Sequence, residues 1–143
     1  MELQGKYTFN APAGRVWSLL MDTEAIAGCI PGCEKLEPLG DDRYRATLTV
    51  ALAAVTGTYQ GTVAMVDKQP PASYRLLVEG QGRPGFVKGE STIALVDRGA
   101  TTDVEVSGNV QIGGAIARVG QRLVGSVGQM MMDRFFACLQ GKT

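Results

Sequence analysis

Few residues in this chain are of the types that usually carry chemistry. The 143 residues include no histidine, which excludes a Ser-His-Asp triad, most catalytic zinc sites and a histidine pH switch within the chain. The carboxylates of Asp103 and Glu105 fall on the polar face of an expected strand. A tyrosine acting without histidine, at an ordinary pKa of about 10, transfers protons poorly at neutral pH. We therefore expect no catalytic residue and a protein that is not an enzyme.

The three cysteines are Cys29, Cys33 and Cys138. An odd number without the spacing of a disulfide framework is typical of a reducing cytoplasm. Cys29 and Cys33 form a C-x3-C pair without the second ligand pair of a structural zinc site, so we expect no metal. Small thiols that pack near a turn are the expected role of both residues.

Charge and hydropathy exclude several classes of protein. The 14 basic and 14 acidic residues balance, which excludes a strongly basic nucleic-acid binder. No apolar run reaches the roughly 18–20 residues that span a bilayer, and the first residues do not resemble a signal peptide. We expect a protein that is not exported and that lies in the cytoplasm, with peripheral contact to the inner face of the membrane as an additional option.

Apolar and polar residues alternate along much of the chain, which is typical of an antiparallel sheet with one dry and one wet face. A further strand is expected between the Pro31-Gly32 turn and Gly40. The seven expected strands are residues 2–10, 33–40, 43–54, 57–67, 73–81, 86–97 and 101–112.

Helical periodicity replaces this alternation in three segments. Residues 12–20 begin with a proline and carry an apolar stripe, and residues 22–27 follow a capping Asp22 or Thr23. Residues 114–139 are expected to form one long helix. A sheet with one apolar face needs a cover, and this helix is the element large enough to supply it. The sequence therefore predicts a single α+β domain over residues 1–143: a curved antiparallel sheet of about seven strands wrapped around a long C-terminal helix, with two short helices after the first strand.

The inner face of this sheet is rich in small residues. The chain has 19 glycines; the small residues expected on the inner face are Gly5, Gly61, Gly80, Gly89, Gly108, Ala46 and Ala54. Protein interiors pack at a density near ~0.74, so small residues on the sheet and on the helix predict an apolar cavity between them. The alternative is that the glycines permit strong sheet curvature and a close approach of the helix.

Any ligand of this cavity should be lipophilic. The inner face carries no Asp, Glu, Lys or Arg, and a buried charge without a partner is costly. Its expected polar atoms are the hydroxyls of Tyr44, Tyr59, Tyr74, Ser91 and Thr102. The residues expected to line the cavity are Trp17, Ile30, Pro31, Tyr59, Gly61, Met65, Val78, Phe86, Ile93, Val106, Ile116, Gly120, Leu123, Val127 and Met131.

Three parts of this prediction have a plainer alternative. Trp17 lies on an apolar helix stripe and also fits the core, while Ile30-Pro31-Gly32 is either a gate or a simple turn. Phe86 follows a Pro-Gly pair and is either a ligand contact or a chance aromatic of a hairpin. Near the C-terminus, the apolar residues Met132, Phe135 and Phe136 are too widely spread around the helix to lie on one face, so some of them should be exposed. They are expected to contact a partner or a membrane, with a dimer contact or core packing as alternatives.

Several motifs resemble the CoxG family, whose members are the G subunits of carbon monoxide dehydrogenase, within the START/polyketide-cyclase-like (SRPBCC) superfamily. The resemblance extends over nearly the whole chain. The most specific motif is Cys29-Ile30-Pro31-Gly32-Cys33-Glu34. The others are Gly5-Lys6-Tyr7-Thr8-Phe9 with Ala11-Pro12, Val16-Trp17-Ser18-Leu19-Leu20 with Asp22, Gly57-Thr58-Tyr59-Gln60-Gly61, Gly108-Asn109-Val110 with Gly113, and Phe135-Phe136.

The resemblance implies a helix-grip, START-like fold with a lipophilic cavity under the C-terminal helix. It also implies an accessory role to a molybdenum-dependent carbon monoxide dehydrogenase or related hydroxylase, through membrane recruitment or handling of its quinone acceptor. We therefore expect no covalent cofactor and a lipophilic ligand of the menaquinone or ubiquinone type. Many members carry a proline-rich linker and a hydrophobic anchor after this domain; the residues up to Thr143 contain neither.

Two other functions remain open at this point. One is a pure assembly factor with a packed core, which would dock the dehydrogenase through its surface. The other is a cyclase- or hydrolase-like enzyme, since the superfamily contains such members. The enzyme would need two or more polar groups that converge in the cavity, which the expected inner face does not supply.

Overall fold

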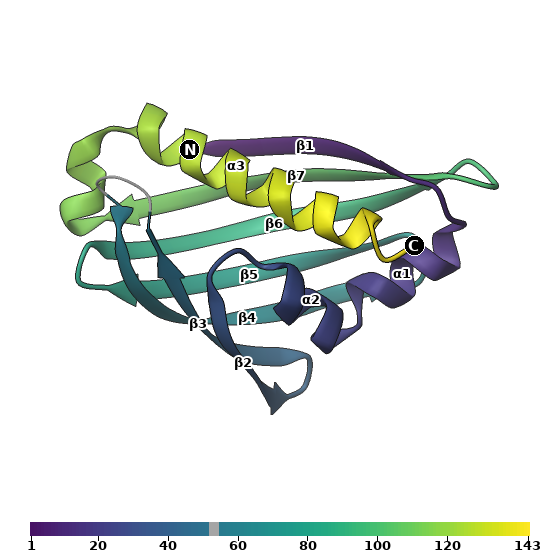
Figure 1. Cartoon of the computed structure of the whole chain (residues 1–143), viewed down its shortest axis with the longest axis horizontal. Coiled ribbons are helices and arrows are strands. Elements are labelled where there is room, and N and C mark those ends of the chain that lie inside the picture. The colour runs from purple at the N-terminus through teal and green to yellow at the C-terminus, as the bar shows by residue number, and fades with distance from the viewer. Residues whose placement is uncertain (52–54) are drawn as a thin grey trace.

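Seven antiparallel strands form one curved sheet in a computed structural model that describes all residues except 52–54 (Figure 1). Their order across the sheet is β1-β7-β6-β5-β4-β3-β2. The strands are β1 (Glu2–Phe9), β2 (Cys33–Gly40), β3 (Arg43–Val50), β4 (Gly57–Gln69), β5 (Ser73–Gly82), β6 (Gly85–Asp97) and β7 (Thr102–Gly113). The predicted fold class is confirmed. The third strand was expected to reach residue 54; β3 ends at Val50, and residues 52–54, including Ala54, lie outside the described part of the chain.

The two short helices follow β1 as predicted. Helix α1 (Ala13–Leu20) begins after Pro12, whose missing N–H costs nothing at a helix start. Helix α2 (Thr23–Cys29) is capped by the Asp22 carboxylate, which accepts hydrogen bonds from the backbone N–H of Glu24 at 3.0 Å and of Ala25 at 3.3 Å. Asp22 thus satisfies donors that have no partner inside the helix.

The prediction of one continuous helix over 114–139 is wrong. Residues Gly114–Val119 form a 3-10 helix, η2, and the α-helix α3 spans Gln121–Gln140. Gly120 separates them with φ of +95°, and Gly114 has φ of +78°. These left-handed values lie outside the α-helical region and are accessible to glycine because it has no Cβ. The apolar periodicity continues through the break, so periodicity alone did not reveal it.

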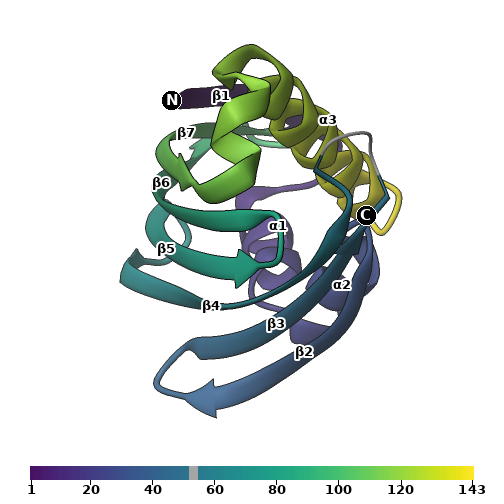
Figure 2. The same cartoon turned by 90° about the vertical axis from the view of Figure 1, so that its left-hand side faces the viewer.

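Helix α3 lies on the concave side of the sheet and packs mainly on β1 and α2 (Figures 1 and 2). Gly128 of α3 faces β1, where an added Cβ would make an ordinary contact, 3.4 Å from Leu3 Cδ1. Farther along, Phe136 stacks on Tyr7 with ring centroids 4.3 Å apart. Figure 2 shows the sheet curling from β1 around to β2, so that α3 is near one edge of the sheet.

The apolar core consists of two separate clusters. The larger cluster joins the ends of β1, β6 and β7 to α1, α2 and α3; Phe9, Val16, Val104 and Leu139 are fully buried in it. The smaller cluster is formed by Val50, Val55 and Ile116, and half-buried residues of η2 and α3 pack against it. The middle of the concave face lies between these clusters.

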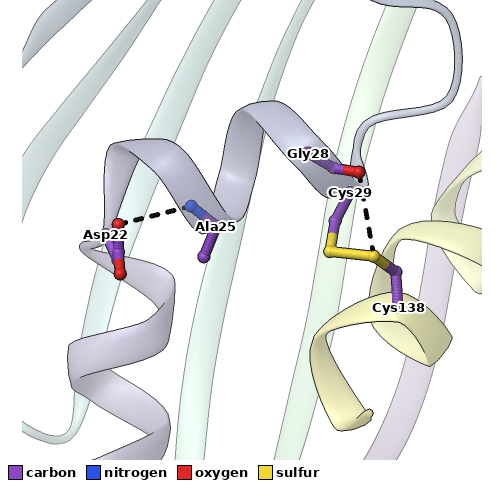
Figure 3. The surroundings of a disulfide bond; sticks show 5 residues. All are labelled: Asp22, Ala25, Gly28, Cys29 and Cys138. Carbon is purple, nitrogen blue, oxygen red and sulfur yellow. Dashed lines mark hydrogen bonds between the residues drawn. A yellow bond between two sulfur atoms is a disulfide. The ribbon is translucent and has the colours of Figure 1, made fainter. Parts of the chain in front are cut away.

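A disulfide joins Cys29 at the end of α2 to Cys138 in the last turns of α3, with a sequence separation of 109 residues (Figure 3). The Cys138 sulfur also lies 3.9 Å from the Gly28 carbonyl oxygen, although a disulfide sulfur has no proton to donate. The prediction that Cys29 is a free packing thiol is therefore wrong, and Cys33 is the free cysteine of the described chain. Spacing could not reveal this pair, because the fold brings its two members together from distant parts of the chain.

Candidate ligand site on the inner face of the sheet

The middle of the concave face is apolar but incompletely covered. Leu48, Val63 and Val78, from β3, β4 and β5, point to this face, are half-buried and belong to neither core cluster. In a fully packed interior such apolar side chains would have no accessible surface, so their partial exposure shows that this region is not fully packed. We therefore take this region, between the two clusters and α3, as the candidate site.

Half-buried residues of the larger cluster extend this region toward the short helices. Trp17, Met21 and Ile26 come from α1, from the turn that follows it and from α2. Tyr44 and Leu76 come from the facing strands. These side chains are apolar or aromatic, so the region offers contacts to a lipophilic molecule.

Strand register places the small residues of the inner face in one row. Ala46 pairs with Gly61, and Gly61 pairs with Gly80. The row continues to Val87 and Ile112. The missing side chains therefore fall in adjacent strands at the middle of the sheet.

Some glycines of the inner face are explained by the curvature of the sheet, and one leaves open space; the sequence had left both explanations open. A Cβ at Gly61 would collide with the Glu79 carbonyl oxygen of the neighbouring strand, and one at Gly82 would collide with the Thr58 carbonyl oxygen. These glycines are required by the bend of the sheet. Gly80 differs: its added Cβ would meet only the Gln60 carbonyl oxygen, at 3.8 Å, which is an ordinary contact. Gly80 therefore leaves space on the inner face.

Most hydroxyls of the inner face are engaged within the protein. Tyr59 donates to the Val55 carbonyl oxygen at 2.7 Å, and Thr102 donates to that of Ala11 at 2.9 Å. Ser91 donates to the Ser107 carbonyl oxygen, and Tyr7 donates to the Asp133 carboxylate. The Tyr44 hydroxyl accepts a hydrogen bond from Thr23. Tyr7 was not among the hydroxyls predicted for this face, although it lies on the inner alternation of β1.

Tyr74 is the exception. Its side chain is 3% exposed, and its ring meets that of Trp17 edge to face with centroids 5.5 Å apart. The described residues give its hydroxyl no hydrogen-bond partner. None of them holds a fully enclosed side-chain oxygen without a partner, so this hydroxyl reaches accessible space. Burial raises the pKa of Tyr74 above its ordinary value, which keeps the phenol neutral.

Within the described strands, the ionised side chains lie on the outer face of the sheet; on the inner side, Asp133 of α3 accepts the hydrogen bond from Tyr7. Asp103 lies on the outer face as expected, but it is 4% exposed. Thr8 Oγ1 donates to it at 2.7 Å, Arg98 Nε lies at 2.5 Å and Lys6 Nζ at 3.7 Å. The hydrogen bond from Thr8, followed by that from Arg98, holds the pKa of Asp103 below its ordinary value. This carboxylate is saturated by its partners and faces away from the candidate site.

Two of the pockets formed by the described residues open on the outer face. One of about 400 Å³ is lined by Gln60, Thr62 and Gln81 among others, and one of about 510 Å³ by Glu79, Lys88 and Gln111 among others. They are shallow and polar-rimmed, so they do not correspond to the predicted apolar cavity. Among the described residues no group of three or more cysteines or carboxylates could hold a metal ion.

The structure distributes the predicted lining residues over three environments. Four are buried in the two clusters and contribute to the core: Met65, Ile93, Val106 and Ile116. Eight are half-buried: Trp17, Ile30, Pro31, Tyr59, Gly61, Val78, Val127 and Met131. Three are exposed: Phe86, Gly120 and Leu123. Trp17 and Val78 are the members that border the candidate site most directly.

The three exposed residues are corrections. Phe86 is 48% exposed on the outer face, where its ring covers Gly113 of the paired strand. Gly120 is the helix break described above, and Leu123, at 40% exposure, lies in the first turn of α3. Each error has a physical cause: Phe86 is one residue out of the inner alternation, and the helical wheel assumed an unbroken helix from residue 114.

The Ile30-Pro31-Gly32 turn is fixed to the sheet. The backbone N–H of Thr49 donates to the Gly32 carbonyl oxygen at 2.9 Å, and that of Cys33 donates to the Ile30 carbonyl oxygen at 3.1 Å. Gly32 has φ of +76° and no room for a Cβ beside the Thr49 carbonyl oxygen. These contacts favour the simple turn over the gate.

The predicted contact surface near the C-terminus is largely inside the molecule. Phe136 is 3% exposed and packs between Tyr7 and Phe9, so its assignment to a partner or membrane contact is wrong. Met132 and Phe135 are half-buried against the same cluster. Core packing, the third alternative, explains Phe136 because α3 rotates this residue toward β1. No helix among the described residues is long and apolar enough to cross a membrane.

Sequence reasoning missed five residues of the site, which fall in two groups. Leu48, Val63 and Leu76 were already on the inner alternation, so a list drawn from whole strands would have included them. Met21 and Ile26 flank the junction of the short helices, where no periodic pattern is long enough to orient a side chain.

Solved structures place this architecture in a known class, that of START-like, helix-grip proteins. A START superfamily protein from Mycobacterium smegmatis has a TM-score of 0.77 and 16% identity, with 99% of this chain and 95% of that chain covered. The Zhui aromatase/cyclase from Streptomyces sp. R1128 has a TM-score of 0.72 and 16% identity, with 99% and 92% covered. At these identities the likeness shows the fold alone.

The family is shown by the sequence. The model of the CoxG family, the G subunits of carbon monoxide dehydrogenase, matches residues 5–143, and the chain belongs to this family. A conserved protein from Geobacillus kaustophilus is 36% identical with a TM-score of 0.96, covering 99% of this chain and 94% of that chain. No curated protein matches the chain. The resemblance inferred from the Cys29–Glu34 motif is thereby confirmed.

Proposed function

We propose that this chain is a non-enzymatic accessory protein that holds a lipophilic molecule, such as an isoprenoid quinone, on the inner face of its sheet. It serves a molybdenum-dependent carbon monoxide dehydrogenase or a related hydroxylase by delivering its electron acceptor or by assisting its recruitment to the membrane. The partner is suggested by the name of the family. The proposal includes a cytoplasmic location with peripheral membrane contact, although the Cys29–Cys138 disulfide removes the cysteine argument for that compartment.

One observation carries the ligand class. The half-buried middle of the concave face, with Leu48, Val63 and Val78, is apolar and carries no Asp, Glu, Lys or Arg among the described residues. A charged ligand would find no counter-charge there, whereas an apolar ligand would gain by removing its surface and that of these side chains from water. The same absence of ionised groups argues against acid–base catalysis at this face.

The first experiment is native mass spectrometry of the purified protein, followed by organic extraction and lipid analysis. The proposal expects a stoichiometric isoprenoid quinone or another lipophilic molecule, either from purification or after incubation with membranes. Recovery of nothing in either preparation would contradict it, and a docking factor with a packed core would then become the better account.

A pair of variants locates the ligand. Gly80→Leu places a large side chain in the open space of the inner face and should abolish uptake. Gly14→Leu is the matched control, because Gly14 lies on the exposed side of α1 and its Cβ would meet no neighbour within 4 Å. Both variants should fold, which circular dichroism checks. Equal uptake by the two variants would place the ligand elsewhere.

A further inference from the structure

We infer that the Tyr74 hydroxyl anchors the polar end of the ligand by donating a hydrogen bond to an uncharged acceptor on it, such as a carbonyl oxygen. This inference rests on the proposed function and goes beyond it, because it names the residue that orients the ligand and the chemical group recognised.

Elimination among the hydroxyls of the inner face singles out Tyr74. The hydroxyls of Tyr7, Tyr59, Ser91 and Thr102 donate within the protein, and that of Tyr44 accepts from Thr23. Tyr74 alone has none among the described residues, although its side chain is only 3% exposed. Its oxygen is not fully enclosed, so the hydroxyl can reach a partner from outside the protein. A ligand with a suitable acceptor would be such a partner.

The position of the ring suits an anchor. Tyr74 pairs with Ile93 across β5 and β6, and its ring is held edge to face by Trp17 at an interplanar angle of 87°. A side chain locked by packing loses little conformational entropy when it binds. Tyr74 and Trp17 belong to the larger cluster, whose half-buried members Tyr44 and Leu76 border the candidate site. The hydroxyl therefore presents a polar atom at the apolar region.

The neighbouring groups define what the ligand must offer. The indole N–H of Trp17 also has no hydrogen-bond partner among the described residues, and indole is a donor only. Burial keeps the Tyr74 phenol protonated by raising its pKa, so it offers its proton over the whole neutral range. Among the described residues, this corner thus supplies two donors and no charged group that shifts the pKa of Tyr74. It fits a carbonyl-bearing lipophile better than a hydrocarbon, an amine or a carboxylate.

The test compares two synthetic probes that differ only in the acceptor: a naphthoquinone with an alkyl tail, and the naphthalene with the same tail. Tyr74→Phe removes the hydroxyl and keeps the ring beside Trp17. Loss of one neutral hydrogen bond should weaken quinone binding roughly two- to tenfold relative to wild type. Binding of the naphthalene should stay unchanged, so the ratio of the two effects isolates the hydroxyl from any change in packing.

Tyr59→Phe is the matched control, because its hydroxyl already donates to the Val55 carbonyl oxygen. It should not alter the relative affinity for the two probes. Infrared spectroscopy gives a second readout: the carbonyl stretch of the bound quinone should rise in frequency in Tyr74→Phe and stay unchanged in Tyr59→Phe. If Tyr74→Phe alters neither the quinone affinity nor the stretch, the inference is wrong while the proposed function stands. If wild type binds neither probe, both are overturned.

Discussion

At the scale of single residues, the inner face of the sheet carries hydroxyls and no ionised side chains among the described strand residues. Its polar atoms are hydroxyls, and within the described chain all but that of Tyr74 are engaged. The buried carboxylate of Asp103 lies on the outer face with Thr8, Arg98 and Lys6 as partners. Residue identities therefore favour recognition of an uncharged lipophile over catalysis.

Gly61 and Gly80 should respond differently to the same substitution. Gly61→Ala pushes a methyl group into the Glu79 carbonyl oxygen and should lower the free energy of unfolding by about 1–3 kcal/mol, the usual cost of overpacking. Gly80→Ala meets only an ordinary contact and should leave stability unchanged or slightly higher. Urea denaturation of both variants measures this difference. Equal losses would mean that the sheet bends alike at both positions.

The Asp103 carboxylate should contribute stability only while it is ionised. Because its partners lower its folded-state pKa, this contribution is complete above the ordinary value of about 3.9 and is lost as the pH falls through the folded-state value. Asp103→Asn should thus be less stable than wild type at pH 7, and the difference should shrink in acid. Urea midpoints across pH measure it; a difference independent of pH would contradict the assignment.

At the scale of elements, two devices hold α3 against the sheet. One is the packing of α3 on β1, in which Phe136 stacks on Tyr7. The other is the disulfide that joins α2 to α3 at the opposite end from the Gly120 break (Figure 3). Helix α3 is thus fixed at its C-terminal end, while its first turn, with Leu123 exposed, is less buried.

Reduction of the disulfide should destabilise the protein substantially. A cross-link between residues 109 positions apart restricts the unfolded chain, and such bonds contribute about 2–5 kcal/mol. A dithiol reductant or Cys138→Ser should lower the melting temperature. Cys33→Ser is the control, because Cys33 is free and its loss should leave the response to reductant intact. A melting temperature insensitive to reductant would show that the bond contributes nothing in solution.

At the scale of the whole molecule, two core clusters flank an accessible apolar face. The buried residues are concentrated in these two clusters, and the middle of the face between them is only half-buried. The likeness to a START superfamily protein and to an aromatase/cyclase shows the fold alone and assigns no activity to this chain. The contents of the inner face, rather than the fold, therefore carry the functional argument.

A ligand that fills this face should stabilise the whole molecule. Binding to the folded state alone adds about 2.7 kcal/mol when the free ligand is at about a hundred times its Kd. Protein loaded with quinone should accordingly melt at a higher temperature than delipidated protein, in a manner that depends on ligand concentration. Gly80→Leu should melt at the same temperature with and without quinone. Stabilisation of that variant equal to wild type would contradict the location of the site.

The alternation of apolar and polar residues predicted six of the seven strands, their dry face and the absence of ionised groups on it, whereas β2 was predicted from its place between the Pro31-Gly32 turn and Gly40. Alternation is a local property with a period of two residues, so it can be recognised in the sequence without knowing which strands pair with one another. The motif around Cys29 was sufficient for the family. Helix positions were predictable wherever a residue such as Asp22 or Pro12 marked the start.

Only the tertiary structure decided the remaining features, because each depends on residues far apart in the chain. The pairing of Cys29 with Cys138 and the burial of Phe136 follow from where α3 lies on the sheet. The different roles of Gly61 and Gly80 follow from the distance to the neighbouring strand, which sequence does not encode locally. That the Tyr74 hydroxyl has no partner among the described residues is known only from the structure, which shows the hydrogen bonds of the other inner-face hydroxyls.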